Sequence, residues 1–554
     1  MGDGERSGWP LSRHVLLLVL AVLALWPLLE LDTEFISDEG SYALQARVLR
    51  ETDDWDMGYP FAAADPEVTY PAHHAARVVG GEVFPYVDHP LWPRVLAWTT
   101  DLVGEGIGLR VVGVGSLVAV AAVGWLLGRH LEPRAAPLAF WVLATSSVLA
   151  NAWMLWAHAA SALAGALLML AAVRPARGWP WLVVAAGASA VGVLLRAEGM
   201  LWALAVAAAV LLTRRDRRGV LLAAVTAGSA GVARALEDDW IRRIIDASGG
   251  SSPLDQRGGD AGFVDRLGGL RRVLIDGAFV SEAGKLLGLA AVVLAVVAAV
   301  ALVRRSGRAA AAALGAAGAV LLVRLVVASE DPAPGLLVVA PALALAVAWR
   351  PRDVTRDVVV VATVLFLGAV AVTIYPDGGS FQWGGRYLSP AIGALAVLAA
   401  AAVRRAQDGL SSAMVRPLTV GVVLLLLGQA VSSVVGPDQI RRDGQQAFSR
   451  LLAAGPPVFI AHGTQAARVD WRGWPERCWI AVPDDGSPED LREVLAVVAR
   501  SGIDDAVYVG FAPDEIEAAG AAVVRAIDGL QAGVVALPSP AGSSAISAGY
   551  GCDR

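Results

Sequence analysis

Two adjacent acidic residues, Asp38 and Glu39, follow closely after the first apolar stretch of the chain. A carboxylate in this place could take the proton of an attacking hydroxyl group or orient it, which is the role of a general base. A plainer alternative is that the pair caps a surface helix, because acidic side chains near a helix N-terminus are favourable by up to about 1 kcal/mol. The residue types alone leave both alternatives open.

Cations at the ends of apolar stretches could supply the complementary half of such chemistry, because they stabilise a phosphate leaving group. Arg386 and Tyr387 lie in the segment 382–390 behind two glycines, which would allow the backbone to approach a ligand closely. Arg386 is therefore either a clamp for a lipid phosphate or a snorkelling anchor. Arg196 and Glu198 share a turn between two apolar stretches, where they could bind a ligand or simply pair with each other.

Three further polar residues, Arg110, His158 and Arg324, fall within or near apolar stretches. A charge inside a membrane segment is a functional candidate by default. For Arg324 the competing explanation is an ion pair that holds two helices together. We expect Arg110, Arg196, Arg324 and Arg386 to be candidates for donor-phosphate binding and His158 to be a further site candidate.

A metal site is a weaker expectation. Asp54 and Asp56 form an Asp-x-Asp pattern whose oxygens could hold a divalent ion, although such a run is more often a solvated loop. His73 and His74 together with Asp88 and His89 offer an alternative set of histidine and carboxylate ligands. For His73 and His74 the plainer explanation is loop histidines, whereas His89 is a candidate for the site in its own right. The sequence assigns no cofactor, and a divalent metal ion stays an open alternative.

The elements that position these residues are membrane helices. Of the 554 residues 56% are hydrophobic and 17% are charged, and the mean hydropathy is +0.57, which is unlike a soluble enzyme. The apolar residues form about thirteen stretches long enough to cross a bilayer core of roughly 30 Å. The predicted spans are 14–31, 106–128, 135–151, 157–173, 179–195, 199–213, 219–236, 285–303, 309–328, 335–349, 357–375, 388–403 and 417–435. The net charge of -6 argues against a nucleic-acid partner.

Arginines occupy every second loop, which predicts a cytoplasmic N-terminus and an extracytoplasmic C-terminus. The first loop, 32–105, therefore faces outward, and it contains two amphipathic stretches at 38–49 and 90–103. We predict two domains: a transmembrane domain over 1–436, with the catalytic first loop, and an extracytoplasmic accessory domain over 437–554.

The tail has the pattern of a small α/β domain, because short apolar runs alternate with helical stretches. The predicted strands are 458–461, 478–482, 506–510 and 533–537. Ser487 followed by Pro488 marks a helix start. If the tail is extracytoplasmic, Cys478 and Cys552 can form a disulfide bond.

The order of these motifs resembles the GT-C superfamily of glycosyltransferases that use polyprenyl-phosphate sugars, such as protein O-mannosyltransferases and aminoarabinose transferases. The features that carry the resemblance are Asp38-Glu39 with Tyr42-Ala43, His89-Pro-Leu-Trp92 leading to Gly108-Leu-Arg110, Leu195-Arg-Ala-Glu-Gly199, and Arg386-Tyr-Leu-Ser-Pro390. It covers roughly 14–435, and it departs from the family at Ala197, where relatives have proline.

The resemblance implies a membrane glycosyltransferase with Asp38 as base and Glu39 as its helper, and with Tyr387, Glu198, His89 and His158 near the site. The donor would be a polyprenyl-phosphate sugar, transferred with inversion to a glycan, lipid or protein acceptor at the outer face of the cytoplasmic membrane. Two alternatives are a secondary transporter, although no inverted repeat is evident, and a non-enzymatic cell-envelope assembly protein.

Overall fold

A computed structural model describes residues 9–32, 37–71, 77–79, 82–84, 89–174, 178–245, 262–276, 280–328, 331, 335–350, 354–375, 383–463, 470–474, 476–483 and 486–537. The chain forms two compact units. Unit 1 comprises Met1–Leu29, Arg110–Asp239 and Ser251–Ile440, and unit 2 comprises Glu30–Leu109, Trp240–Gly250 and Arg441–Arg554. The domains predicted from the sequence group the first loop with the membrane helices. In the structure the first loop belongs to unit 2, together with the tail.

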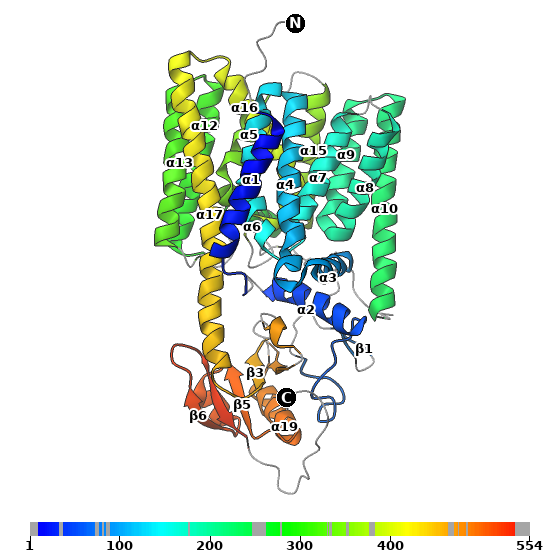
Figure 1. Cartoon of the computed structure of the whole chain (residues 1–554), viewed down its shortest axis with the longest axis vertical. Helices are drawn as coiled ribbons and strands as arrows, with labels where there is room; N and C mark the ends of the chain where they lie inside the picture. Colours follow the sequence, from blue (N-terminus) through cyan, green and yellow to red (C-terminus); the bar gives the residue numbers. More distant parts are fainter. Residues whose placement is uncertain are drawn as a thin grey trace. The chain divides into compact units, whose positions relative to one another are not determined.

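Unit 1 is an assembly of helices (Figure 1). Its α-helices are α1 (Leu11–Leu25), α4 (Glu105–Leu131), α5 (Ala136–Ala144), α6 (Ser147–Trp153), α7 (His158–Val173), α8 (Trp179–Leu195), α9 (Ala197–Thr213), α10 (Arg217–Ile245), α11 (Phe263–Arg271), α12 (Glu282–Val303), α13 (Gly307–Val327), α14 (Leu336–Val339), α15 (Val354–Thr373), α16 (Ile392–Gln407) and α17 (Ser412–Leu452). Shorter turns are η2 (Trp26–Leu28), η3 (Pro133–Ala135), η5 (Arg272–Asp276), η6 (Pro341–Ala348) and η7 (Arg386–Ala391).

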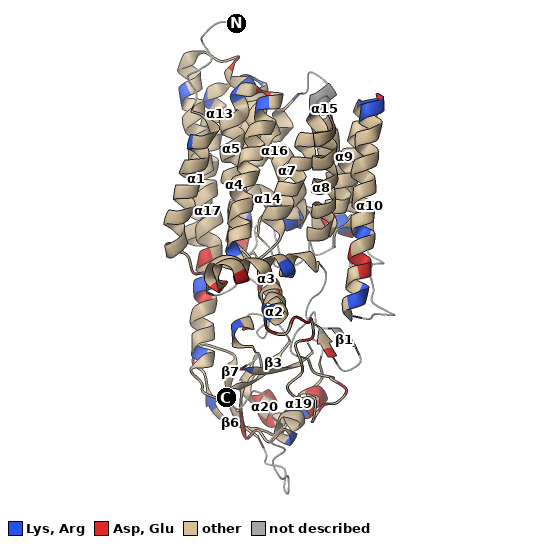
Figure 2. Ribbon diagram, turned by 45° about the vertical axis from the view of Figure 1, so that its right-hand side comes forward, with Lys and Arg blue, Asp and Glu red and all other residues tan. Residues whose placement is uncertain are grey.

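Among the described residues, seven helices are long and apolar enough to cross a membrane, or eight if the bent pair Pro133–Ala144 and Ser147–Trp153 is one span. Four shorter apolar helices accompany them: His158–Val173, Trp179–Leu195, Ala197–Thr213 and Val358–Thr373. Charged residues of unit 1 gather mostly at helix ends, and the middles of the helices are largely uncharged (Figure 2). This is the distribution that a bilayer requires, because charge is costly in its core. The count of thirteen spans stays a prediction.

Two predicted spans are irregular. The stretch 135–151 bends by 46° between α5 and α6, where the Ser146 hydroxyl accepts the Val148 N–H and begins a new helix. The stretch 335–349 is not one α-helix but the short α14 followed by the 3-10 turn η6, because Pro341 lacks an N–H and interrupts the helix. Most of this stretch is buried in protein, the condition under which irregular backbone is tolerated at membrane depth.

Unit 2 combines a helical layer with a mixed sheet. The first loop contributes α2 (Ser37–Thr52), the hairpin β1 (Arg77–Val79) and β2 (Glu82–Phe84), and α3 (Leu91–Val103). The tail contributes β3 (Val458–His462), η8 (Trp471–Gly473), β4 (Cys478–Val482), α19 (Pro488–Arg500), β5 (Asp505–Val509), α20 (Pro513–Ala518), β6 (Ala522–Ala526) and β7 (Ala532–Ala536). The strand order is β4-β3-β5-β7-β6, with β4, β3 and β5 parallel and β7 and β6 antiparallel.

All four predicted tail strands are present, and β6 is an additional one. Its side chains are mostly exposed, so it lacks the buried apolar run that marked the others. The predicted helix start is confirmed, because the Ser487 hydroxyl and N–H both bond to Asp490 Oδ2 at 2.7 Å. Cys478 is disulfide-bonded, and Cys552 lies outside the described residues.

The first loop binds the tail sheet directly. Pro71 bridges to Ile480 on β4, and the Ala481 N–H donates to the Tyr70 carbonyl at 3.3 Å. Trp474 Nε1 donates to the Met57 carbonyl at 3.2 Å. These hydrogen bonds make the loop an added layer of the tail domain, which the sequence pattern does not indicate.

The amphipathic stretch 38–49 is the helix α2, and its apolar side is buried within the protein. Tyr42, Leu44, Val48 and Leu49 are each at most 3% exposed. Helix α2 packs against α3 and η8 within unit 2. Burial in protein and burial in lipid select the same residue types, so the sequence does not distinguish them.

Candidate active site

Two arginines from distant parts of unit 1 lie against the ring of Tyr387. The guanidinium carbon of Arg386 is 5.2 Å from the ring centre and that of Arg196 is 6.0 Å from it. Arg386 Nη2 also donates to the Tyr387 hydroxyl at 3.2 Å. We call Arg196, Glu198, Arg386 and Tyr387 the arginine–tyrosine cluster; all four were predicted as site residues from the sequence.

Within the cluster, Glu198 neutralises one cation. Arg196 Nε donates to Glu198 Oε2 at 3.1 Å, and both side chains are buried. Arg196 is extended between α8 and α9, and Glu198 lies in the first turn of α9, so the turn holds the two together. Arg386 adds a second guanidinium against the same tyrosine ring. Two partly buried guanidinium groups at one place have the donor geometry that suits a phosphate group.

Arg386 is oriented by the turn before it. Gly384 and Gly385 have φ angles of 68° and 64°, which favour glycine. A Cβ atom on Gly385 would lie 2.7 Å from Leu336 Cβ and from the Val273 carbonyl, and one on Gly384 would lie 2.3 Å from Ser147 Cβ. The glycines thus allow close packing of protein segments; their contacts do not show the ligand approach that the sequence pattern suggested.

The segment between α6 and α7 brings further predicted residues toward the cluster. Arg386 lies 5.6 Å from the ring centre of Trp156, and that ring is 4.8 Å from the ring of the buried His158. Arg110 donates to the carbonyl of Trp153, the last residue of α6. The Arg386 guanidinium therefore lies over two aromatic rings, which hold it without removing its charge.

Arg324 occupies a different place in unit 1. Its Nε donates to the Gly284 carbonyl of α12 at 3.3 Å, and its Nη2 is 3.7 Å from Asp331 Oδ2. Asp331 in turn accepts the Ser281 N–H and hydroxyl, each at 2.8 Å. This network joins α13 to the start of α12, which favours the interhelical explanation over donor binding.

The acidic pair lies in unit 2, in the first turn of α2. Asp38 is half-buried, whereas Glu39 is completely buried and 3.4 Å from Arg441 Nη2 of α17. Arg441 was missed from the sequence, because it is one of many arginines and stands 402 residues from Glu39. Gln45, on the same helix, is fully buried, and its amide atoms have no hydrogen-bond partner among the described residues.

The remaining candidates give no metal site in the described part of the chain, where no group of three His, Cys, Asp or Glu residues could hold an ion. Asp54 Oδ1 accepts the Trp55 N–H, and Asp56 Oδ1 accepts the N–H groups of Gly58 and Val83. Both carboxylates therefore accept hydrogen bonds from the backbone of the loop. His89 is 4% exposed and its carbonyl accepts the Trp92 N–H at the start of α3. His73 and His74 lie outside the described residues.

Comparison with solved structures identifies a shared fold. The chain superposes on ArnT from Cupriavidus metallidurans bound to undecaprenyl phosphate with a TM-score of 0.52, 14% identity, and coverage of 94% of this chain and 97% of that one. For ArnT from the same organism in the apo state, the TM-score is 0.53 at 14% identity, with 95% and 98% coverage. The archaeal oligosaccharyltransferase AglB from Archaeoglobus fulgidus gives a TM-score of 0.46 at 12% identity, with 91% and 70% coverage.

No protein-family model and no curated protein sequence matches the chain. The solved structures nevertheless confirm the fold that the motifs had predicted, that of GT-C membrane glycosyltransferases.

Proposed function

We propose that this chain is a membrane glycosyltransferase that moves a sugar from a polyprenyl-phosphate donor to an acceptor at the outer face of the cytoplasmic membrane. The observation that carries the proposal is the fold shared over 94% of the chain with ArnT, a protein crystallised with undecaprenyl phosphate. The arginine–tyrosine cluster supports it, because two guanidinium groups, whose N–H donors suit phosphate oxygens, lie against one tyrosine ring.

In the proposed reaction the bond between the sugar C1 and the phosphate oxygen breaks while a bond forms between C1 and the acceptor oxygen. Asp38 takes the proton of the acceptor hydroxyl, and the polyprenyl phosphate leaves with its extra negative charge. Arg386, held by Tyr387 and Trp156, stabilises that charge. Because the aromatic contacts fix the guanidinium before the donor arrives, little reorganisation is needed when charge develops.

Glu39 is assigned a supporting role, since its carboxylate is already engaged by Arg441. Arg196 is partly neutralised by Glu198, so the proposal gives it a secondary share of phosphate binding.

Incubation of the purified protein with extracts of lipid-linked sugars, followed by mass spectrometry, tests the proposal. We expect one polyprenyl-phosphate sugar to be consumed and free polyprenyl phosphate to accumulate in step with a glycosylated acceptor. Consumption should fall by about 10² to 10⁴ in rate with Asp38→Asn. Unchanged levels of every polyprenyl-phosphate sugar in the presence of acceptor extracts would refute the proposal.

The outward placement of the site is tested separately by a reporter that is active only outside the cytoplasm, fused after Arg554. Activity of the fusion is expected from the alternating arginine loops. A silent fusion, with an active cytoplasmic reporter at the same position, would reverse the proposed orientation.

A further inference from the structure

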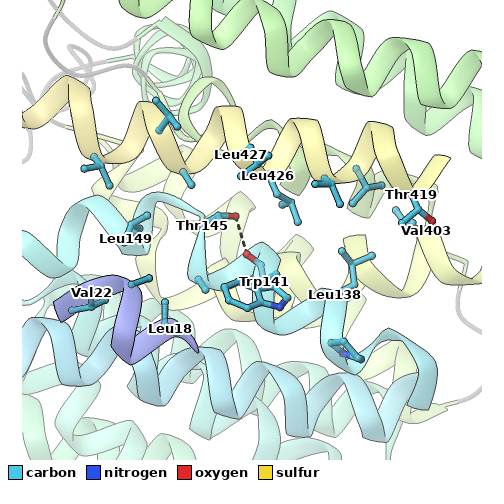
Figure 3. A pocket seen from close by; sticks show the side chains of 18 of the residues that line it. Leu18, Val22, Leu138, Trp141, Thr145, Leu149, Val403, Thr419, Leu426 and Leu427 are labelled. Atoms are coloured by element: carbon cyan, nitrogen blue, oxygen red, sulfur yellow. Dashed lines mark hydrogen bonds between the residues drawn. The ribbon is translucent and has the colours of Figure 1, made fainter. Parts of the chain in front are cut away.

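Unit 1 contains an apolar groove of about 690 Å³ that the proposed reaction does not use. It is lined by α1, α5, α6, α16 and α17, and Figure 3 shows the side chains of Leu18, Val22, Leu138 and Leu426 along it. The Thr145 hydroxyl within the groove is satisfied, because it donates to the Trp141 carbonyl at 2.8 Å and accepts from Gln429 at 3.1 Å. The lining therefore presents carbon atoms almost throughout.

One end of the groove is polar and cationic. Arg404 and Gln407 line it from the last turn of α16, and Thr419 lines it from α17. Arg404 Nη1 donates to Gln407 Oε1 at 2.7 Å, and Gln407 Nε2 donates to Thr419 at 3.3 Å. The Nε atom of Arg404 is buried and has no hydrogen-bond partner in the described ranges. A cation with spare donor capacity at the end of an apolar groove fits an anionic headgroup with a hydrocarbon tail.

The position of Arg404 excludes the donor lipid of the proposed reaction as the occupant. Arg386 begins η7, which leads directly into α16, and Arg404 lies in the last turn of α16, so the two arginines are 18 positions apart along these turns. At 1.5 Å per residue, this separation is roughly 27 Å, most of a bilayer core. A lipid whose phosphate lies at the arginine–tyrosine cluster cannot place it at Arg404. The groove therefore suits a lipid of the opposite leaflet.

We propose that the groove holds one resident anionic phospholipid, with its phosphate at Arg404 and an acyl chain along α17. The residues of α17 that line the groove extend from Thr419 to Val435. This length of helix is greater than the roughly 15 Å that an acyl chain needs to cross half of the bilayer core. The lipid would hold α1 against α5 and α17, because few side chains of α1 are buried by protein: His14, Leu18 and Val22. Two of these, Leu18 and Val22, line the groove.

The test uses the full-length protein in detergent and native mass spectrometry of the lipid that it retains. We expect about one phosphatidylglycerol-class or other anionic phospholipid per chain. Arg404→Gln should reduce the retained lipid about five-fold, the size expected for one arginine contact at a membrane surface. Arg416→Gln is the matched control, because Arg416 is an exposed arginine in the first turns of α17 and does not line the groove.

A second variant keeps the proposal testable if Arg404→Gln folds poorly. Ala430→Trp would fill the groove from α17 without changing charge, and it should also release the lipid. In a thermal assay, phosphatidylglycerol should raise the Tm of the wild type more than phosphatidylcholine does, and both groove variants should lose this difference. Equal effects of the two lipids, equal losses in Arg404→Gln and Arg416→Gln, or retention of polyprenyl phosphate in this groove would overturn the proposal.

Discussion

Arg441 and Glu39 form an ion pair in which neither side chain reaches solvent. Nη2 of the arginine is 3.4 Å from Oε1 of the glutamate, and the side chains are 1% and 0% exposed. The arginine comes from the long helix α17 and the glutamate from the first turn of α2. Since Asp38 is the neighbouring residue, this pair fixes the helix start that carries the proposed base.

Breaking this pair from either side should destabilise the protein. Arg441→Leu or Glu39→Leu leaves a buried charge without its partner, which typically costs about 3–5 kcal/mol. The double variant removes both charges and should regain part of the loss. Thermal unfolding of the purified protein measures the effect, with Arg492→Gln as the exposed control expected to cost less than about 1 kcal/mol. Additive losses in the double variant would show that the two residues do not act as a pair.

Asp38→Asn should abolish most transfer while leaving the protein folded. The amide keeps the size of the side chain but cannot take a proton, and a general base typically contributes about 10² to 10⁴ in rate. Turnover of a polyprenyl-phosphate sugar by well-expressed protein is the measurement. Asp54→Asn, an exposed aspartate of the same unit, should transfer normally with or without a chelator. Normal turnover by Asp38→Asn would remove Asp38 from the role of base.

Arg386→Lys should impair transfer about tenfold, and Arg386→Ala should impair it more. Lysine keeps the charge but loses the planar fork that can hold two phosphate oxygens and lie on the rings of Tyr387 and Trp156. The rate at subsaturating donor is the quantity to compare. Arg405→Lys is the matched control, because Arg405 also lies on an aromatic ring of unit 1, that of Trp349. Equal rates for Arg386→Lys, Arg386→Ala and wild type would exclude a phosphate contact.

Arg324→Met should reduce stability by a few kcal/mol but leave transfer per folded molecule close to the wild-type rate, because this arginine holds Gly284 and Asp331. The double variant, with Arg324→Met and Asp331→Asn, should recover part of the lost stability, because it removes the charge that Arg324→Met leaves without its partner. Unfolding temperature and turnover are measured on the same preparations. A stable but inactive Arg324→Met variant would instead restore Arg324 as a donor-binding candidate.

The start of α19 should depend on pH through Asp490. Hydrogen bonds from the Ser487 N–H and hydroxyl lower the pKa of Asp490 below its usual value. A lowered pKa stabilises the folded state above the usual aspartate value of about 4, and this stabilisation is lost as the pH falls through the lowered value.

Hydrogen exchange of residues 488–500 measures the effect. Ser487→Ala should exchange roughly five-fold faster at neutral pH, as expected for loss of a helix cap. After correction for intrinsic exchange rates, the difference between wild type and Asp490→Asn should shrink toward pH 3. A difference that does not change with pH would refute the role of the ionised carboxylate.

The sequence by itself determined the local elements and the residue types of the site. Apolar stretches longer than a bilayer core identified the membrane helices, the Ser487 cap began a helix where predicted, and four apolar runs became tail strands. These features depend on neighbours within a few residues, so their pattern is visible along the chain. The motifs around Arg196 and Arg386 were found in the same way.

Only the tertiary structure decided which of these residues meet. It placed Tyr387 between Arg196 and Arg386, gave Glu39 a partner 402 residues away, and assigned Arg324 to a helix contact. It also joined the first loop to the tail sheet. Such pairings depend on how helices and strands pack across long sequence separations. A chain with dozens of arginines offers many candidate partners, and only packing and the cost of burying an unpaired charge select among them.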